Sequence, residues 1–170
     1  MKGALKKQLD QIEEFSVSQE FFGSGGQTGI AIDNQQKSIC LLSKNEAAQI
    51  FLGKDILSCE IFEDEITVTN TKRSSQISAA LLGGLVFGGV GAIIGGLSGK
   101  TQTSGKVTKM GIRLIVNDAI NPVREIILLS SETKKGGMLY NLAIRVARLW
   151  HGMIKVLIWQ ADLDDEQAQG

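Results

Sequence analysis

The chain has very few of the residues on which metal sites and redox centres are usually built. It contains one histidine and two cysteines in 170 residues. Cys40 and Cys59 lie inside strand-like segments of a chain long enough to build its own core, which indicates reduced, buried thiols and no disulfide framework. His151 has no cysteine or carboxylate at ligand spacing, and nothing beside it supports a Cys–His nucleophile pair. We therefore expect no metal, no cofactor and no enzyme activity.

Aromatic residues are also scarce, and neither charge is in excess. Phe, Trp and Tyr make up 5% of the chain, too few for a platform that stacks nucleic acid bases. Eighteen acidic and eighteen basic residues give a formal net charge of zero, so no overall field attracts nucleic acid. Residues 1–14 contain no continuous apolar run, so we expect no secretory signal and a cytoplasmic protein. A bacterial or phage origin is a separate expectation. An acidic cluster is expected to be a solvated turn rather than an acid–base pair; it consists of Glu60, Glu63, Asp64 and Glu65.

Seven short strand-like segments account for much of the chain. Each combines β-branched or other apolar residues with polar turns at its ends. A break at residues 117–121 is reinforced by Pro122, the only proline in the sequence. The expected strands are residues 29–33, 37–42, 49–55, 56–62, 65–71, 106–116 and 124–130.

Helical periodicity is found near both ends of the chain. Apolar residues from Leu5 to Phe15 predict a short amphipathic helix over residues 3–15. The cluster of glycines at residues 23–29 is expected to form a flexible linker. It lacks the preceding strand and the GK[ST] motif that a phosphate loop needs. The longest helical pattern covers residues 137–160, and the acidic residues 161–170 are expected to be frayed. The stripe expected to face the core comprises Leu139, Leu142, Ala143, Val146, Leu149, Trp150, Met153 and Leu157.

Seven short strands followed by one amphipathic helix predict an α+β, mainly β fold. The pattern resembles the bacterial PH-like domains of the GRAM/YokE-related kind, through residues 29–33, 54–62 and the helix from Leu139 to Leu157. This resemblance implies a seven-stranded barrel capped by the C-terminal helix, with the glycine-rich apolar segment as an insertion between two strands. The expected organisation is residues 1–22 as N-terminal helix and linker, 28–160 as the PH-like domain, 77–99 as the insertion and 161–170 as an acidic tail. A four- or five-stranded α+β sheet with the same final helix is the alternative.

The insertion is the most unusual part of the sequence. Between Arg73 and Lys100 lie 26 residues without a charge, and eight of them are glycine. Nine large apolar residues between residues 81 and 97 argue against a solvated loop. Small residues recur every four positions in two rows, the spacing that allows apolar helices to approach closely. The rows that form this glycine zipper are Ala80, Gly84, Gly88, Ala92 and Gly96, and Gly91, Gly95 and Gly99.

The strands on either side restrict how the insertion could meet a bilayer. If residues 65–71 and 106–116 belong to one sheet, a single span would place the two strands on opposite sides of the membrane. We therefore expect the segment to double back at Gly88-Gly89 as a helical hairpin, in lipid or packed on protein. The flanking cations would then face anionic headgroups, or would serve only as solubilising charge; they are Lys72, Arg73, Lys100 and Lys106.

Two functional hypotheses follow from the sequence. The first is a non-enzymatic, membrane-associated PH-like module at the inner face of the membrane, which self-associates through the glycine zipper into a homo-oligomer. The alternative is a soluble homo-oligomeric scaffold or protein-binding module, whose glycine hairpin packs on another copy or on a partner in water.

Overall fold

Ten strands and two helices make up the part of the chain that the computed structural model describes, residues 2–73 and 105–169. Short 3-10 turns follow β1 and β4, at Ser24–Gly26 and Gly53–Asp55. In chain order the helices and strands are α1 (Lys2–Asp10), β1 (Gln19–Phe22), β2 (Thr28–Asp33), β3 (Ser38–Ser43), β4 (Glu46–Leu52), β5 (Ile56–Glu63), β6 (Ile66–Lys72), β7 (Lys106–Val107), β8 (Met110–Val116), β9 (Val123–Leu129), β10 (Thr133–Lys134) and α3 (Met138–Gln169).

The strands form two antiparallel sheets of four strands each. The first sheet has the order β1-β2-β3-β4 and the second has the order β6-β5-β8-β9, while β7 and β10 form a separate two-stranded ribbon. The mainly β fold with a C-terminal helix is therefore confirmed. The predicted seven-stranded closed barrel is not what the structure has, because the described sheets remain separate. β1 and β10 were not predicted, and the predicted strand over residues 106–116 is divided into β7 and β8.

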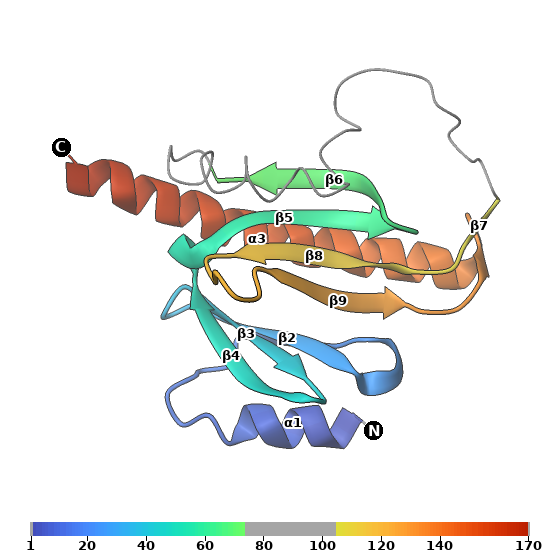
Figure 1. Cartoon of the computed structure of the whole chain (residues 1–170), viewed down its shortest axis with the longest axis horizontal. Coiled ribbons are helices and arrows are strands. Elements are labelled where there is room, and N and C mark those ends of the chain that lie inside the picture. The colour runs from blue at the N-terminus through green and yellow to red at the C-terminus, as the bar shows by residue number, and fades with distance from the viewer. Residues whose placement is uncertain (1, 74–104, 170) are drawn as a thin grey trace.

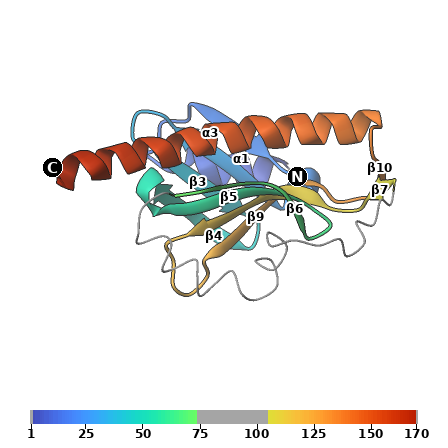
Figure 2. The ribbon, with the colours of Figure 1, turned by 90° about the horizontal axis from the view of Figure 1, so that it is seen from above.

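The main core lies between the two sheets and α3. Isoleucines of β2 and β3 meet residues of β5, β8 and β9, and α3 lies across the face of the second sheet that points away from the viewer in Figure 1, as Figure 2 shows from above. A smaller core forms where α1 covers the other face of the first sheet with Leu5 and Leu9. α1 ends at Asp10, earlier than the predicted residue 15, but Phe15 still packs into this core.

The glycine cluster at residues 23–29 is not a flexible linker. Gly23 N donates a 2.8 Å hydrogen bond to Thr28 O, which closes a hairpin between β1 and β2. A Cβ on Gly23 would lie 2.3 Å from the carbonyl oxygen of Ile127, so this position requires glycine. The cluster is thus the turn of a hairpin inside the first sheet.

Helix α3 differs from its predicted form in both length and orientation. It continues to Gln169, so the acidic segment predicted to be frayed forms its last turns. Trp150 and Leu157 face the core as expected, but Leu139, Leu142 and Leu149 are exposed. The buried face consists instead of Ala143, Ile144, Ala147, Trp150, His151, Ile154, Leu157, Ile158 and Ala161. Apolar residues occur all round this helix, so the stripe with the most leucines is not the one that packs on the sheets.

Candidate functional site

The two ends of the glycine segment are attached to the same sheet. Strands β6 and β8 lie on either side of β5 and both run antiparallel to it. The prediction that these two strands share one sheet is therefore confirmed. Lys72 of β6 lies opposite Ser58, whereas Met110 of β8 lies opposite Glu63, so the chain leaves at one end of β5 and returns at the other. Five residues of β5 separate these positions, about 17 Å of strand.

The departing end is fixed by Arg73, whose side chain is only 4% exposed. Its Nε lies 2.8 Å from Asp162 Oδ1 of α3, and its terminal nitrogens contact Asp165 and the carbonyl oxygen of Lys54. Arg73 N also donates to Leu57 O at 2.9 Å. The prediction that Arg73 faces lipid headgroups is therefore wrong, because its charge is used inside the fold to hold β6 to α3.

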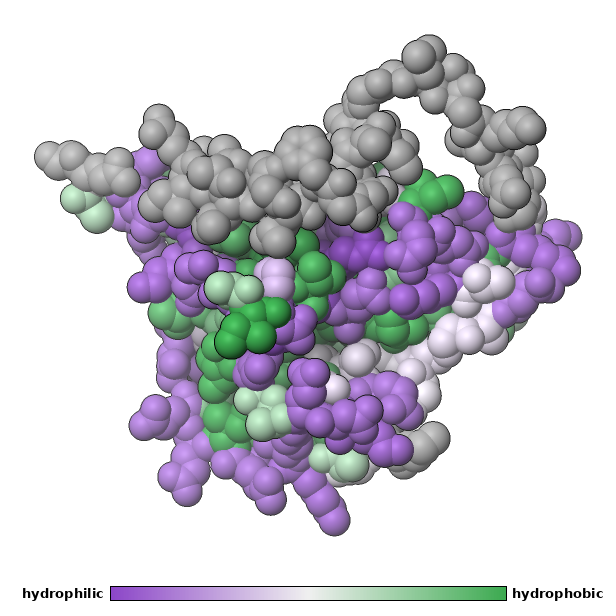
Figure 3. Space-filling view, viewed as in Figure 1, coloured by the Kyte–Doolittle hydropathy of each residue, from purple (hydrophilic) through white to green (hydrophobic). Residues whose placement is uncertain are grey.

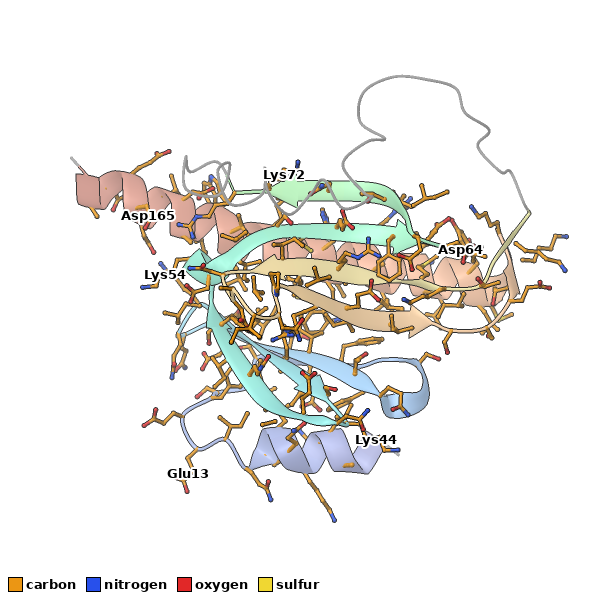
Figure 4. The ribbon with its side chains drawn as sticks, in the orientation of Figure 1. Glu13, Lys44, Lys54, Asp64, Lys72 and Asp165 are labelled. Carbon is orange, nitrogen blue, oxygen red and sulfur yellow. The ribbon has the colours of Figure 1, made fainter. Side chains whose placement is uncertain are left out.

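The returning end is held by the β7–β10 ribbon. Lys135 N donates to Gly105 O at 2.8 Å, and Lys106 Nζ forms a 2.6 Å ion pair with Glu132 Oε1. Lys72 is exposed on β6, the edge strand of the second sheet (Figure 4). The structure thus places Lys72 and Lys106 near opposite ends of the sheet. Lys100 and the eight small residues of the glycine zipper lie outside the described residues.

The acidic turn is also tied to the returning end. Asp64 Oδ1 accepts hydrogen bonds from Thr108 N, Thr108 Oγ1 and Lys109 N at 2.6 to 2.9 Å. Burial opposes ionisation of Asp64, but these hydrogen bonds outweigh it and hold the pKa of this carboxyl below its ordinary value. Asp64 therefore links the β5–β6 turn to the segment between β7 and β8.

The sequence predicted that the whole acidic cluster is solvated, but Glu60 and Glu63 are buried. Glu63 is buried and bonds Tyr140 Oη at 2.8 Å and Lys135 Nζ at 2.9 Å. Glu60 is buried against Arg113 Nη1 at 2.6 Å. Glu60 and Glu63 therefore form structural ion pairs within the fold.

Arg113 is the centre of a charged network on the face of the second sheet opposite α3. Besides Glu60, it reaches Glu125 and Glu65, and its guanidinium carbon lies 4.5 Å from the centre of the Phe62 ring. Burial opposes ionisation of Glu125, but hydrogen bonds from Lys109 and Arg113 hold its pKa below the ordinary value. Figure 3 shows the resulting hydrophilic surface over this sheet near the β5–β6 turn. Each carboxylate has a cationic partner, so the network supports structure rather than acid–base chemistry.

Cys59 and His151 lie close together but are poorly suited to nucleophilic catalysis. His151 sits on the buried face of α3, with a ring nitrogen 3.3 Å from Thr71 Oγ1 and a hydrogen bond to the backbone of Cys59. Burial raises the pKa of the Cys59 thiol and lowers that of His151, so both groups are held neutral. A reactive cysteine needs the opposite shift, toward the thiolate.

A small pocket of about 180 Å³ opens between the first sheet and β9. Arg124 lines it, and its Nη2 is bonded to Gln49 Oε1 at 2.7 Å and to Asp118 Oδ2 at 3.1 Å. Arg124 Nε is buried without a hydrogen-bond partner. Asp118 neutralises this guanidinium and two glutamates also line the pocket, so the arrangement does not select an anion.

Two further findings apply to residues 2–73 and 105–169. Within these ranges no group of three or more His, Cys, Asp or Glu side chains is placed to hold a metal ion. Neither α1 nor α3 is both long and apolar enough to span a bilayer.

Comparison with known proteins supports the PH-like interpretation. Residues 18–130 match a family model described as a glycine zipper containing PH domain. The chain is 25% identical over 175 residues to the SPbeta prophage-derived uncharacterized membrane protein YomJ of Bacillus subtilis (strain 168), covering 92% of this chain and 77% of that protein. It is also 25% identical over 174 residues to a protein of Bacillus phage SPbeta named Immunity protein, covering 92% and 87%. No solved structure matches the chain.

The family match begins one residue before β1 and ends one residue after β9, so it includes both four-stranded sheets and the glycine segment between β6 and β7. The chain therefore belongs to the family of glycine zipper containing PH domains.

Proposed function

We propose that this chain is a non-enzymatic PH-like module that associates with the inner face of a membrane and self-associates through the glycine zipper at residues 77–99. The observation that carries this proposal is the attachment of both ends of the glycine segment to strands on either side of β5. Because one folded domain holds both ends, the uncharged segment has to enter and leave lipid on the same side.

Contacts within the domain hold the chain at both ends of the glycine segment. Arg73 ties the departing end to α3, and Asp64 together with the β7–β10 ribbon ties the returning end to the sheet. The 26 uncharged residues between Arg73 and Lys100 are then held by a rigid frame while they meet an apolar environment. In a hairpin that turns at Gly88-Gly89, each helical arm would satisfy its own backbone, and the small residues would allow the arms of one copy or of two copies to pack closely and cover the turn.

The relatives support a role at membranes and suggest a biological setting. One relative is named a membrane protein and the other an immunity protein. We infer that this chain also takes part in immunity of the cell that carries it, through its membrane-associated form. Challenge of cells with and without the gene by a related phage tests this role, because equal plaque numbers would contradict it.

A liposome flotation assay tests the membrane association. The glycine segment begins near one end of β5 and returns near the other. A simple deletion would shorten the connection between β6 and β7 and could disturb the sheet. The matched control instead replaces residues 77–97 with a Gly/Ser linker of 21 residues, which keeps its length. We expect the full chain to float with anionic vesicles and the linker variant to stay at the bottom. Equal flotation of the two proteins would overturn the proposal.

The second candidate is a soluble homo-oligomeric scaffold or protein-binding module. The exposed apolar residues of α3 favour it, since such surfaces are typical of protein contacts. Purification without detergent as a uniform oligomer that does not float would support this candidate. Gly88→Leu tests the zipper apart from other contacts, because a large side chain at this position would block the close approach of helices. An unchanged oligomer in this variant would argue against the zipper in both cases.

A further inference from the structure

A pocket between the two sheets contains a buried hydrogen-bond donor that no described residue satisfies. The pocket has a volume of about 180 Å³ and is lined by residues of β2, β3 and β4 from the first sheet and of β9 from the second. β9 is an edge strand of the second sheet and lies beside the first sheet (Figure 1). No described residue of β6 or β7 lines the pocket, so it is separate from the strands that hold the glycine segment.

The donor is Nε of Arg124, whose side chain is 10% exposed. Nη2 of the same guanidinium donates to Gln49 of β4 and to Asp118 of the loop between β8 and β9, so contacts from both sheets hold the side chain in place. A buried N–H without an acceptor is unfavourable for the fold. The pocket therefore favours a ligand that brings an acceptor oxygen to Arg124 Nε.

The outer edge of β9 supplies backbone groups beside this donor. Ile127 N donates to Thr28 Oγ1 at 3.2 Å, across the gap between the sheets. Backbone groups of alternate residues point to the same side of a strand, so the N–H and C=O of Glu125 also face away from β8. Glu125 lines the pocket, and its carbonyl oxygen is suited to accept from a ligand. A ligand with an acceptor oxygen next to an N–H donor matches both groups, and this is the pattern of a carboxamide.

The charges around the pocket favour a neutral ligand. The charge of Arg124 is balanced by Asp118 at 3.1 Å, and Glu125 is paired with the cations of the Arg113 network. An anion would meet no unbalanced cation among the described lining residues and would approach the exposed Glu46. A cation would meet the buried guanidinium. Both charged forms would thus lose hydration without gaining a partner in the pocket.

The volume limits the ligand to a small molecule. An apolar cavity of about 150 Å³ holds benzene, so this pocket can hold a ring with one polar substituent. Leu41, Val123 and Ile126 line the pocket and provide apolar surface for such a ring.

We propose that the pocket between β4 and β9 binds a small neutral molecule that carries a carboxamide group. Its carbonyl oxygen accepts from Arg124 Nε, its N–H donates to the carbonyl oxygen of Glu125, and its apolar part lies against Leu41, Val123 and Ile126. Such a ligand contacts both sheets at once.

Titration with three small molecules of one shape tests the chemistry of the pocket. Benzamide carries the neutral carboxamide, benzoate has a carboxylate in its place, and benzamidine has a cation. Saturation-transfer NMR with the full chain measures the dissociation constant of each molecule. We expect millimolar binding of benzamide and at least about tenfold weaker binding of the two charged molecules. No binding of benzamide, or equally tight binding of either charged molecule, would overturn the proposal.

Two variants test whether benzamide binds in this pocket. Arg124→Lys keeps a cation beside Asp118 but removes the Nε–H, and it should weaken benzamide binding at least about tenfold. Ala47→Phe places a ring at the exposed rim of the pocket and should block it without disturbing the core. Ile50→Phe is the matched control, since Ile50 is exposed on the same strand but does not line this pocket. Unchanged binding in Ala47→Phe, or in folded Arg124→Lys, would show that benzamide binds elsewhere and that the proposal is wrong.

Discussion

Arg73 and Asp162 form an ion pair of 2.8 Å between the last residue before the glycine segment and the far end of α3. The two residues are 89 positions apart in the chain, and both side chains are largely removed from solvent, at 4% and 12% exposure. The pair thus connects the strand that leads into the glycine segment with the helix that packs across the second sheet.

Replacement of Arg73 by methionine should destabilise the domain by about 2–3 kcal/mol, because the buried ion pair with Asp162 and the contact with the carbonyl oxygen of Lys54 are lost. Urea denaturation measures the change in the free energy of unfolding. Lys72→Met is the control, since Lys72 is exposed and its loss should stay within about 0.5 kcal/mol. Equal midpoints for the two variants would contradict the anchoring role of Arg73.

The Arg113 network gives a second stability prediction. Arg113→Met should lower the free energy of unfolding by about 3 kcal/mol, since it leaves the buried Glu60 and the half-buried Glu125 with fewer cations. Arg113→Lys should recover only part of this loss, because one ammonium cannot reach three carboxylates in the geometry of a guanidinium. Full recovery by lysine would show that only the charge matters.

The lowered pKa of His151 predicts how the stability of the domain depends on pH. Burial holds its pKa in the fold below the ordinary value of 6.5, so the unfolded chain takes up a proton more readily. The stabilisation by neutral His151 is complete above pH 6.5 and is lost as the pH falls through the folded-state pKa. Between pH 7.5 and 5.5 the native chain should therefore lose more stability than His151→Gln. Parallel curves for the two proteins would refute this assignment.

Gly111 should tolerate no side chain. A Cβ at this position would lie 2.4 Å from the carbonyl oxygen of Ile126 and 3.0 Å from the Phe62 ring. Gly111→Ala should thus destabilise the domain by about 2 kcal/mol and displace the ring on which Arg113 rests. Gly105→Ala, which meets no atom within 4 Å, is the matched control and should have little effect in thermal unfolding.

Local patterns predicted the class of the fold but not its long-range contacts. Alternating apolar residues indicated most strands, and the uncharged glycine run indicated the insertion, because both signals lie within a few neighbouring residues. The buried role of Arg73 depends on Asp162, a partner far away in the chain, and no local signal marks it as different from Lys72. The orientation of α3 also could not be derived locally. Leu142 and Leu149 make its outer stripe as apolar as the inner one, and only the shape of the sheets decides which face is buried.

The proposed function depends on the glycine segment bringing this domain to a membrane. The most direct measurement is fractionation of cells that express either the full chain or the variant in which a Gly/Ser linker of equal length replaces residues 77–97. We expect the full chain in the membrane pellet and the linker variant in the supernatant. A full chain that stays in the supernatant, together with the variant, would contradict it.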